Sequence, residues 1–238
     1  KLSSTIGLGD EKYDAKVLEH SLNNTFADIK LSQLALPTCF VSYDIQERQP
    51  KIFKQHLATK KEEEDFLVKD VLRGSSAAPT YFETAQIESL GSDNKQQILI
   101  DGGMVANDPA LVAYSEAINQ GYASGIADMM IVSIGTGRRL KPYKYASAKS
   151  WGLVGWAKPS IDIALEGGPQ MVEYHMKQIA STVNSTTTNY FRIKPDLFDA
   201  SPDLDNATPE NLAALFNAGK ENAKQLDQQL NDIVSLLV

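Results

Sequence analysis

The chain contains 238 residues, of which 42% are hydrophobic and 22% are charged, which is the composition of an ordinary globular protein. That length predicts one domain or a tight pair of domains with a sizeable core. The formal net charge of −7 disfavours nucleic acid as a partner and provides no electrostatic attraction toward anionic lipid.

Cysteine content and the start of the chain bear on where the protein works. Cys39 is the only cysteine, so no internal disulfide can form, and its apolar neighbours predict a buried core thiol. No apolar run approaches the length of a membrane span, so we expect no transmembrane segment in this chain. No signal peptide is visible and the chain starts at Lys1, which indicates a shortened or processed sequence. Cytoplasmic and secreted locations both stay open.

The first half of the chain predicts short elements separated by polar turns. In chain order these are a helix over 13–26, a buried strand over 36–43, its partner strand over 50–54, a charge run over 60–65 that reads as a solvated loop or helix start, and a helix over 66–73 that stops at Gly74. The glycine would occupy the position just past the last helical residue.

The second half alternates strands and helices. The predicted elements are a strand over 98–100, a helix opened by Asp108-Pro109 and running to Gly121, a strand over 129–134 that is apolar on both faces, an irregular stretch over 141–158, a helix over 159–183 interrupted at Gly167-Gly168-Pro169, and a strand over 190–193. This alternation predicts a layered α/β fold with a mostly parallel sheet. The first βα units of such a sheet are not visible in this sequence.

A last helix is predicted from Thr208-Pro209 onward. Its apolar stripe has a 3-4 spacing and consists of Leu212, Leu215, Gly219, Ala223, Leu226, Leu230, Ile233 and Leu237. We expect the stripe to pack on the domain, because Gly219 and Ala223 suit close contact with a fixed surface. A coiled coil is the alternative.

The candidate catalytic residue is Asp101, which follows an apolar strand and precedes Gly102 and Gly103. Open α/β sheets place their active sites at the carboxyl ends of strands, and glycines let a substrate or another backbone come close. An aspartate so placed could take a proton from a serine hydroxyl. Taken alone, however, Asp-Gly-Gly after a strand is more often a plain turn.

The expected nucleophile is missing from this sequence. No serine sits in the Gly-x-Ser-x-Gly turn that usually presents one. Ser75 and Ser76 follow a helix instead of forming a strand–turn–helix elbow, so we do not assign them this role. We therefore interpret the chain as most of a serine acyl hydrolase that lacks its nucleophile.

Three sequence blocks together resemble the patatin-like phospholipase family. Residues 73–82 (Arg-Gly-Ser-Ser-Ala-Ala-Pro-Thr-Tyr-Phe) resemble that family's Ala-Thr-Ser-Ala-Ala-Pro-Thr-Tyr-Phe segment. Residues 101–109 (Asp-Gly-Gly-Met-Val-Ala-Asn-Asp-Pro) resemble its Asp-Gly-Gly-x-x-x-Asn-Asn-Pro block, and residues 133–137 (Ser-Ile-Gly-Thr-Gly) resemble its Ser-Leu-Gly-Thr-Gly block. Their order and spacing agree with the family, and the resemblance spans nearly the whole chain. Asp108 replaces an asparagine and caps a helix equally well.

The resemblance implies a three-layer α/β/α fold in which residues 1–238 form one patatin-like domain, incomplete at its N-terminal end. It also implies a Ser–Asp dyad without histidine that hydrolyses phospholipids or other acyl esters through an acyl-enzyme, with Asp101 as general base and Gly102 and Gly103 shaping the site. The partners it implies are an acyl-ester lipid and, transiently, a membrane surface. No metal or organic cofactor is implied, and the oligomeric state stays open.

Other candidates have weaker support. Gly135-Thr136-Gly137 lacks the spacing of a phosphate loop, and His20, His56 and His175 lack metal-ligand spacing. Trp151, Leu153, Val154 and Trp156 could contact a lipid interface or fill the protein's own core. Two alternatives to the hydrolase remain: an inactive fragment or pseudoenzyme that binds lipid or a partner, and an interaction module built on the C-terminal stripe.

Overall fold

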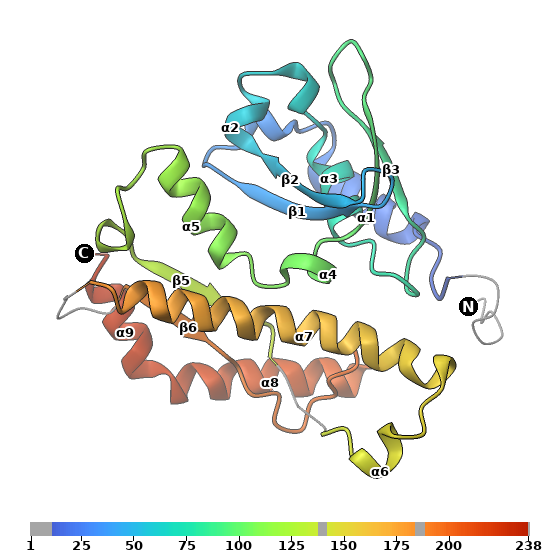
Figure 1. The fold of residues 1–238 in the computed structure, drawn as a ribbon, viewed down its shortest axis with the longest axis vertical. Coiled ribbons are helices and arrows are strands. Elements are labelled where there is room, and N and C mark those ends of the chain that lie inside the picture. The colour runs from blue at the N-terminus through green and yellow to red at the C-terminus, as the bar shows by residue number, and fades with distance from the viewer. Residues whose placement is uncertain (1–10, 138–141, 184–188, 238) are drawn as a thin grey trace. The chain divides into compact units, whose positions relative to one another are not determined.

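The computed structural model describes residues 11–137, 142–183 and 189–237, and it divides into two compact units (Figure 1). Unit 1 comprises Lys1–Pro109 and Lys158–Met171, and unit 2 comprises Ala110–Ala157 and Val172–Val238. In the part of the chain that the structure describes, no helix is long and apolar enough to cross a membrane.

Unit 1 contains a four-stranded sheet with the order β2-β1-β4-β3. Its strands are β1 (Cys39–Asp44), β2 (Gln49–Lys54), β3 (Ala85–Glu88) and β4 (Gln96–Asp101), and all three strand pairs are antiparallel. The predicted strands are thus present as β1, β2 and β4, but Cys39 at the start of β1 is half-buried, so the prediction of a buried core thiol is not confirmed. The helices are α1 (Lys16–Phe26), α2 (Gln55–Ala58), α3 (Val68–Ser75) and α4 (Gly103–Ala106), with 3-10 turns at Leu31–Gln33 and Glu62–Glu64.

Helix α3 lies against β1, β3 and β4, and α1 packs on α3. Apolar side chains from the sheet, α3 and the connecting turns form one core, which includes Leu31, Phe53, Phe66, Val71 and Leu99. The rings of Phe53 and Phe66 meet edge to face at 5.0 Å, an arrangement that aromatic pairs prefer.

The prediction that Gly74 stops the preceding helix is wrong, because α3 continues to Ser75 and is capped at Ser76. Gly74 is required for packing instead. A Cβ at this position would lie 2.5 Å from Leu99 Cδ1, so only glycine lets α3 approach β4 closely.

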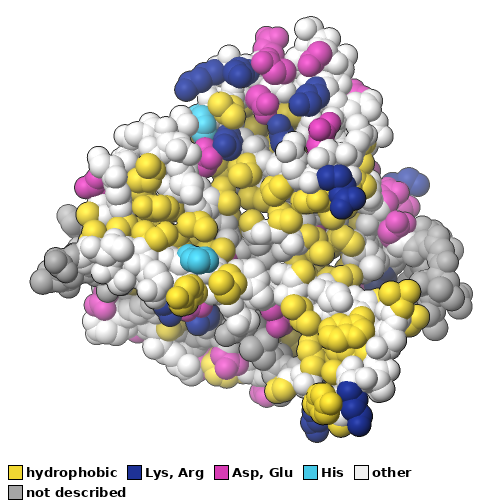
Figure 2. All heavy atoms as spheres, in the orientation of Figure 1, with side chains coloured by type: hydrophobic (Ala, Val, Ile, Leu, Met, Phe, Trp, Pro, Cys, Tyr) yellow, Lys and Arg dark blue, Asp and Glu magenta, His cyan; other side chains and the backbone are white. Residues whose placement is uncertain are grey.

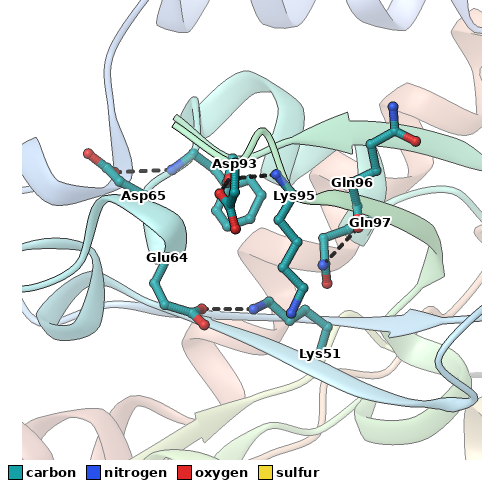
Figure 3. A network of polar contacts seen from close by, with 9 residues as sticks. Lys51, Glu64, Asp65, Asp93, Lys95, Gln96 and Gln97 are labelled. Carbon is teal, nitrogen blue, oxygen red and sulfur yellow. Dashed lines mark hydrogen bonds and ion pairs between the residues drawn. The ribbon is translucent and has the colours of Figure 1, made fainter. Parts of the chain in front are cut away.

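The charge run over 60–65 combines a solvated part with a buried one. Residues 60–63 are exposed as predicted, but Asp65 is buried and accepts hydrogen bonds from the Ser32 backbone N–H at 3.0 Å and the Ser32 hydroxyl at 2.6 Å. Glu64 pairs with Lys51 of β2 at 2.8 Å, as the close view in Figure 3 shows. Glu64 therefore fastens the run to the sheet, and Asp65 fastens it to the 3-10 turn at Leu31–Gln33.

Unit 2 is built on a parallel pair, β5 (Ile131–Ile134) and β6 (Tyr190–Ile193). Its helices are α5 (Ala110–Asn119), α6 (Tyr145–Ala148), α8 (Pro209–Gln225) and α9 (Asp227–Ser235), with a 3-10 turn at Ile126–Asp128. One core forms around Met176, Tyr190 and Ile126. A second core forms where Leu226, Leu230 and Ile233 pack against β5 and β6 residues.

Helix α7 (Leu153–Ala180) supplies residues to both units and corrects two predictions. The predicted irregular stretch over 141–158 contains α6 and the first turns of α7 in its described part. The predicted interruption at Gly167-Gly168-Pro169 is absent, because α7 runs through it without a break. A proline inside a helix removes one backbone donor, and the loss is compensated here by a side chain described below.

The predicted C-terminal helix is two helices that meet at Leu226. Packing on the unit is confirmed for Leu226, Leu230 and Ile233 but not for the α8 part of the stripe. There Leu212 is exposed, and a Cβ at Gly219 would meet no atom within 4 Å, so Gly219 makes no close contact. The buried side chains of α8 are instead Asn211, Ala218 and Asn222.

The α/β class is confirmed, but a mostly parallel central sheet is not. Among the described residues, the four-stranded sheet is antiparallel throughout and β5–β6 is the parallel pair. The run over 129–134, whose two apolar faces predict a parallel strand, does form the parallel pair as β5, whereas β1 to β4 pair antiparallel.

Candidate active site

Asp101 is the last residue of β4, and it lies opposite Ser42 of β1 in the antiparallel register. Its backbone N–H donates to the Ala77 carbonyl at 3.0 Å, past the point where the pairing of β4 with β3 ends at Leu99. The position of the Asp101 backbone is therefore fixed by β4 itself, by pairing with β1 and by the turn after α3.

The Asp101 carboxylate is half-buried and accepts a hydrogen bond from a backbone N–H in the turn that follows β4. Its Oδ1 accepts from the Gly103 backbone N–H at 2.6 Å, which closes a tight turn directly after the strand. Burial raises the pKa of Asp101, and the Gly103 hydrogen bond offsets part of that increase. A carboxylate with a raised pKa is a stronger base, as proton abstraction from a hydroxyl requires.

Position 102 has no room for a side chain. A Cβ there would lie 2.0 Å from the Val41 carbonyl oxygen and 2.4 Å from the Val41 carbonyl carbon, both of them backbone atoms. Its φ of −65° is open to any residue, so the close approach of β1 accounts for the glycine. The Ser75 hydroxyl donates to the same Val41 carbonyl at 2.7 Å, which ties α3 to β1 beside the turn.

Gly103 and Asn107 join the turn to helix α7. A Cβ at Gly103 would lie 3.0 Å from Asp101 Oδ1 and 3.1 Å from Leu165 Cδ2, a tight fit. The Asn107 amide donates to the Leu165 carbonyl at 2.8 Å. That carbonyl is the one left without its helical donor by Pro169, four residues later, so Asn107 replaces the missing hydrogen bond.

The serines near Asp101 are held by structural contacts. Ser76 donates its hydroxyl to the Leu72 carbonyl at 2.8 Å, as Ser75 does to Val41, so both protons are engaged with backbone oxygens. Ser42 is fully buried, and its Oγ has no hydrogen-bond partner among the described residues. Neither the sequence pattern nor the alternation of β1 distinguishes this serine from an ordinary strand residue.

The third sequence block lies in unit 2, at the end of β5. Ser133 is buried and accepts a hydrogen bond from Arg192 Nη1 at 2.6 Å, and the Gly135 N–H donates to the Ile193 carbonyl at 3.0 Å. Gly137 adopts a φ of +92°, which favours glycine, and a Cβ there would lie 2.8 Å from Leu197. The contacts of this block therefore connect β5 to β6.

The histidines show no catalytic arrangement. His20 is exposed and forms a hydrogen bond with Asn24 at 2.9 Å, whereas His56 is buried. His175 lies on α7, with its ring 5.5 Å from that of Tyr174. The described residues contain no group of three or more histidine, cysteine or acidic side chains that could hold a metal ion.

A pocket of about 250 Å³ in unit 1 is lined by α1, α3 and β3, and Asp101 is not among its lining residues. Its charges are of both signs and are largely paired: Lys69 contacts Asp28 at 3.0 Å, and Arg73 contacts Glu19 at 3.2 Å. The pocket therefore favours neither an anion nor a cation, and it is not part of the Asp101 site.

Known proteins match this chain over most of its length. Residues 1–114 match the family model described as Patatin-like phospholipase. Patatin-like protein 2 of Arabidopsis thaliana is 31% identical over 241 residues, which cover 92% of this chain and 59% of that protein. The chain belongs to the patatin-like phospholipase family. Patatin-like protein 1 of the same plant is 29% identical and is matched over 94% of this chain and 59% of its own length.

The patatin-like relatives also bear on activity. The chain spans about three fifths of the length of these curated relatives. A further relative, named Probable inactive patatin-3-Kuras 1 of Solanum tuberosum, is 27% identical over 92% of this chain and 62% of its own length. Membership of the patatin-like phospholipase family supports hydrolase activity on lipids at the level of the family.

Proposed function

We propose that the protein is a lipid acyl hydrolase of patatin type in which Asp101 is the general base of a Ser–Asp dyad. The observation that carries the proposal is the half-buried carboxylate at the end of β4, whose pKa burial raises and whose orientation the Gly103 N–H fixes at 2.6 Å. Membership of a phospholipase family supports an acyl-ester lipid as substrate. The nucleophile is a serine outside residues 1–238.

The reaction proceeds in two steps. Asp101 takes the proton of the serine hydroxyl while the serine oxygen attacks the ester carbonyl, and the alcohol leaves with that proton. Water then attacks the acyl-enzyme while Asp101 accepts a proton from it. The bond between the acyl carbon and the serine oxygen breaks, Asp101 returns the proton to that oxygen, and the fatty acid is released. Gly102 and Gly103 shape the turn that holds the carboxylate: Gly102 admits the Val41 carbonyl, and the Gly103 N–H orients the Asp101 carboxylate.

The proposal extends to the architecture of the complete protein. Residues 1–238 act as one patatin-like domain with the segment that carries the serine, and β5–β6 belongs to a larger parallel sheet in a three-layer α/β/α fold. The protein works on its substrate at a membrane surface and needs no metal or organic cofactor.

The test is the hydrolysis of a short-chain p-nitrophenyl ester by the complete protein carrying Asp101→Asn. The asparagine Oδ1 still accepts from Gly103, but the base is lost, so we expect kcat to fall by about 10²-fold or more. Asp70→Asn is the matched control, because burial also raises the pKa of Asp70, which lies on α3 outside the Asp-Gly-Gly turn. Unchanged turnover by Asp101→Asn would remove Asp101 from the dyad.

A second candidate function is lipid or partner binding without catalysis. Two observations favour it: these 238 residues contain no Gly-x-Ser-x-Gly motif, and one relative is named probable inactive. Turnover by the complete protein that depends on Asp101 would exclude it.

A further inference from the structure

The segment 142–157 of unit 2, here called the aromatic segment, exposes large apolar side chains. It contains α6 and the first turn of α7. Tyr145 is 82% exposed, Leu153 92% and Val154 89%. Figure 2 shows hydrophobic side chains gathered with basic ones over the part of the molecule where Figure 1 labels α6.

Three aromatic rings of the segment pack against one another. Trp151 meets Tyr143 at 5.2 Å and Trp156 at 5.0 Å, both edge to face. The Trp156 N–H donates to the Gly152 carbonyl at 3.1 Å, which closes the first turn of α7 around Leu153 and Val154. These two residues thus lie in the first turn of α7, in a segment whose aromatic rings suit the boundary between hydrocarbon and water.

The charge of this region is opposite to that of the rest of the chain. From Met129 to Ile161 the sequence contains no acidic residue, although 30 of the 238 residues are Asp or Glu and the net charge is −7. Lys144 and Lys149 flank Tyr145 and are both exposed. The net charge alone predicts no attraction to anionic lipid, but its uneven distribution leaves one basic surface where the apolar side chains are exposed.

We propose that the aromatic segment docks the protein on an anionic phospholipid membrane, with Leu153 and Val154 entering the acyl boundary and Lys144 and Lys149 contacting the headgroups. The proposal rests on the proposed function, because a lipid hydrolase must meet its substrate at a membrane surface. It commits to lipid because lysines beside exposed aliphatic and aromatic side chains match both parts of an anionic interface.

The first test is co-sedimentation of the complete protein with vesicles of phosphatidylcholine, with and without phosphatidylserine. We expect binding to increase with phosphatidylserine and to weaken with salt. The double variant Leu153→Asp/Val154→Asp should bind about tenfold less tightly or worse, because two buried aliphatic side chains are replaced by charges that the headgroups repel. The matched control is Leu36→Asp in unit 1, a leucine that is 73% exposed, which should bind like the wild type.

A second variant guards against loss of folding in the first. Lys144→Gln/Lys149→Gln removes charge but no apolar contact, and we expect about a tenfold loss on phosphatidylserine vesicles with little change on phosphatidylcholine alone. Wild-type binding by both double variants overturns the proposal. So does a lowered melting temperature of Leu153→Asp/Val154→Asp with unchanged vesicle binding, since the segment would then be an internal packing surface or a protein interface.

Failure of this proposal is distinguishable from failure of the proposed function. Asp101→Asn should lower kcat for ester hydrolysis by about 10²-fold or more and leave vesicle binding intact. The aromatic-segment variants should leave hydrolysis of a soluble short-chain ester intact and slow only the hydrolysis of vesicle phospholipid.

Discussion

Strands β4 and β5 both end in a glycine-containing turn, but the polar side chain at each end has a different environment. At the end of β4, the carboxylate of Asp101 is half-buried and accepts a hydrogen bond from the Gly103 N–H. Burial raises the pKa of Asp101. At the end of β5, Ser133 is buried and bonded by Arg192 at 2.6 Å. A polar residue before a glycine-containing turn at a strand end is therefore a candidate catalytic group in one unit and a structural contact in the other.

The comparison teaches that the glycines serve packing in both turns. Gly102 admits the Val41 carbonyl, and Gly137 admits Leu197 with a positive φ. A candidate catalytic site is distinguished by a titratable group in a desolvated position. The surroundings of the group create this feature, and residue type alone does not reveal it.

The largest expected effect is that of Gly102→Ala. The new methyl group would overlap the backbone of Val41 at 2.0 Å, and two strands cannot separate without losing ladder pairs, so we expect a loss of about 3 kcal/mol or more in the free energy of unfolding. Urea denaturation measures it. Gly219→Ala on α8 is the control, because its Cβ would meet nothing within 4 Å and alanine should stabilise the helix by roughly 0.5–1 kcal/mol. Equal stabilities for both variants would contradict the packing argument.

Ser133→Ala should weaken unit 2 without touching chemistry. The substitution removes the acceptor of the Arg192 guanidinium, and we expect a loss of about 1.5 kcal/mol in stability, typical of a hydrogen bond to a charged group. Ester hydrolysis per folded molecule should not change. The exposed Ser181 serves as the control serine. A fall in kcat for Ser133→Ala would erase the distinction between the two strand ends.

Asn107→Ala tests the link between the Asp101 turn and α7. Loss of the Asn107 amide leaves the Leu165 carbonyl without a protein donor, which we expect to cost about 1 kcal/mol. Pro169→Ala restores a backbone N–H four residues after Leu165, so Asn107→Ala should cost less in that background. A double-mutant cycle measures the coupling, and strictly additive effects would show that Asn107 does not replace the helical hydrogen bond.

Local patterns predicted strands β1, β2 and β4, helices α1 and α3 and the position of Asp101, but not β3, α2 or α4. Patterns failed where a partner distant in sequence decides the outcome. Gly74 reads as a helix stop until Leu99 is seen against it, and Pro169 reads as a break until Asn107 is seen to compensate for it. The apolar stripe of α8 predicted that its leucines would be buried, yet the buried side chains of this helix include Asn211 and Asn222. Their amides bond backbone groups of Ser201 and Asp196, which spacing cannot anticipate.

The pH dependence of stability sharpens the comparison further, because only the β4 end carries a group with a raised pKa. Since burial raises the pKa of Asp101, the folded protein holds this proton more tightly than the unfolded chain does. The resulting stability is fully present below the unfolded pKa of about 3.9 and is lost as the pH rises through the folded pKa. Asp101→Asn carries no charge to desolvate, so it should be more stable than the wild type at pH 7 and approach it near pH 4.

Urea denaturation at both pH values measures the difference, and Asp14→Asn provides a control of opposite sign. The backbone N–H of Lys16 holds the pKa of Asp14 below its usual range, so the ionised Asp14 favours the folded state and its replacement should not stabilise the protein at pH 7. A carboxylate retained at the expense of stability is expected of a residue kept for chemistry. Asp101→Asn that is less stable than the wild type at pH 7 would instead show that the ionised Asp101 carboxylate stabilises the fold, a structural role like that of Ser133.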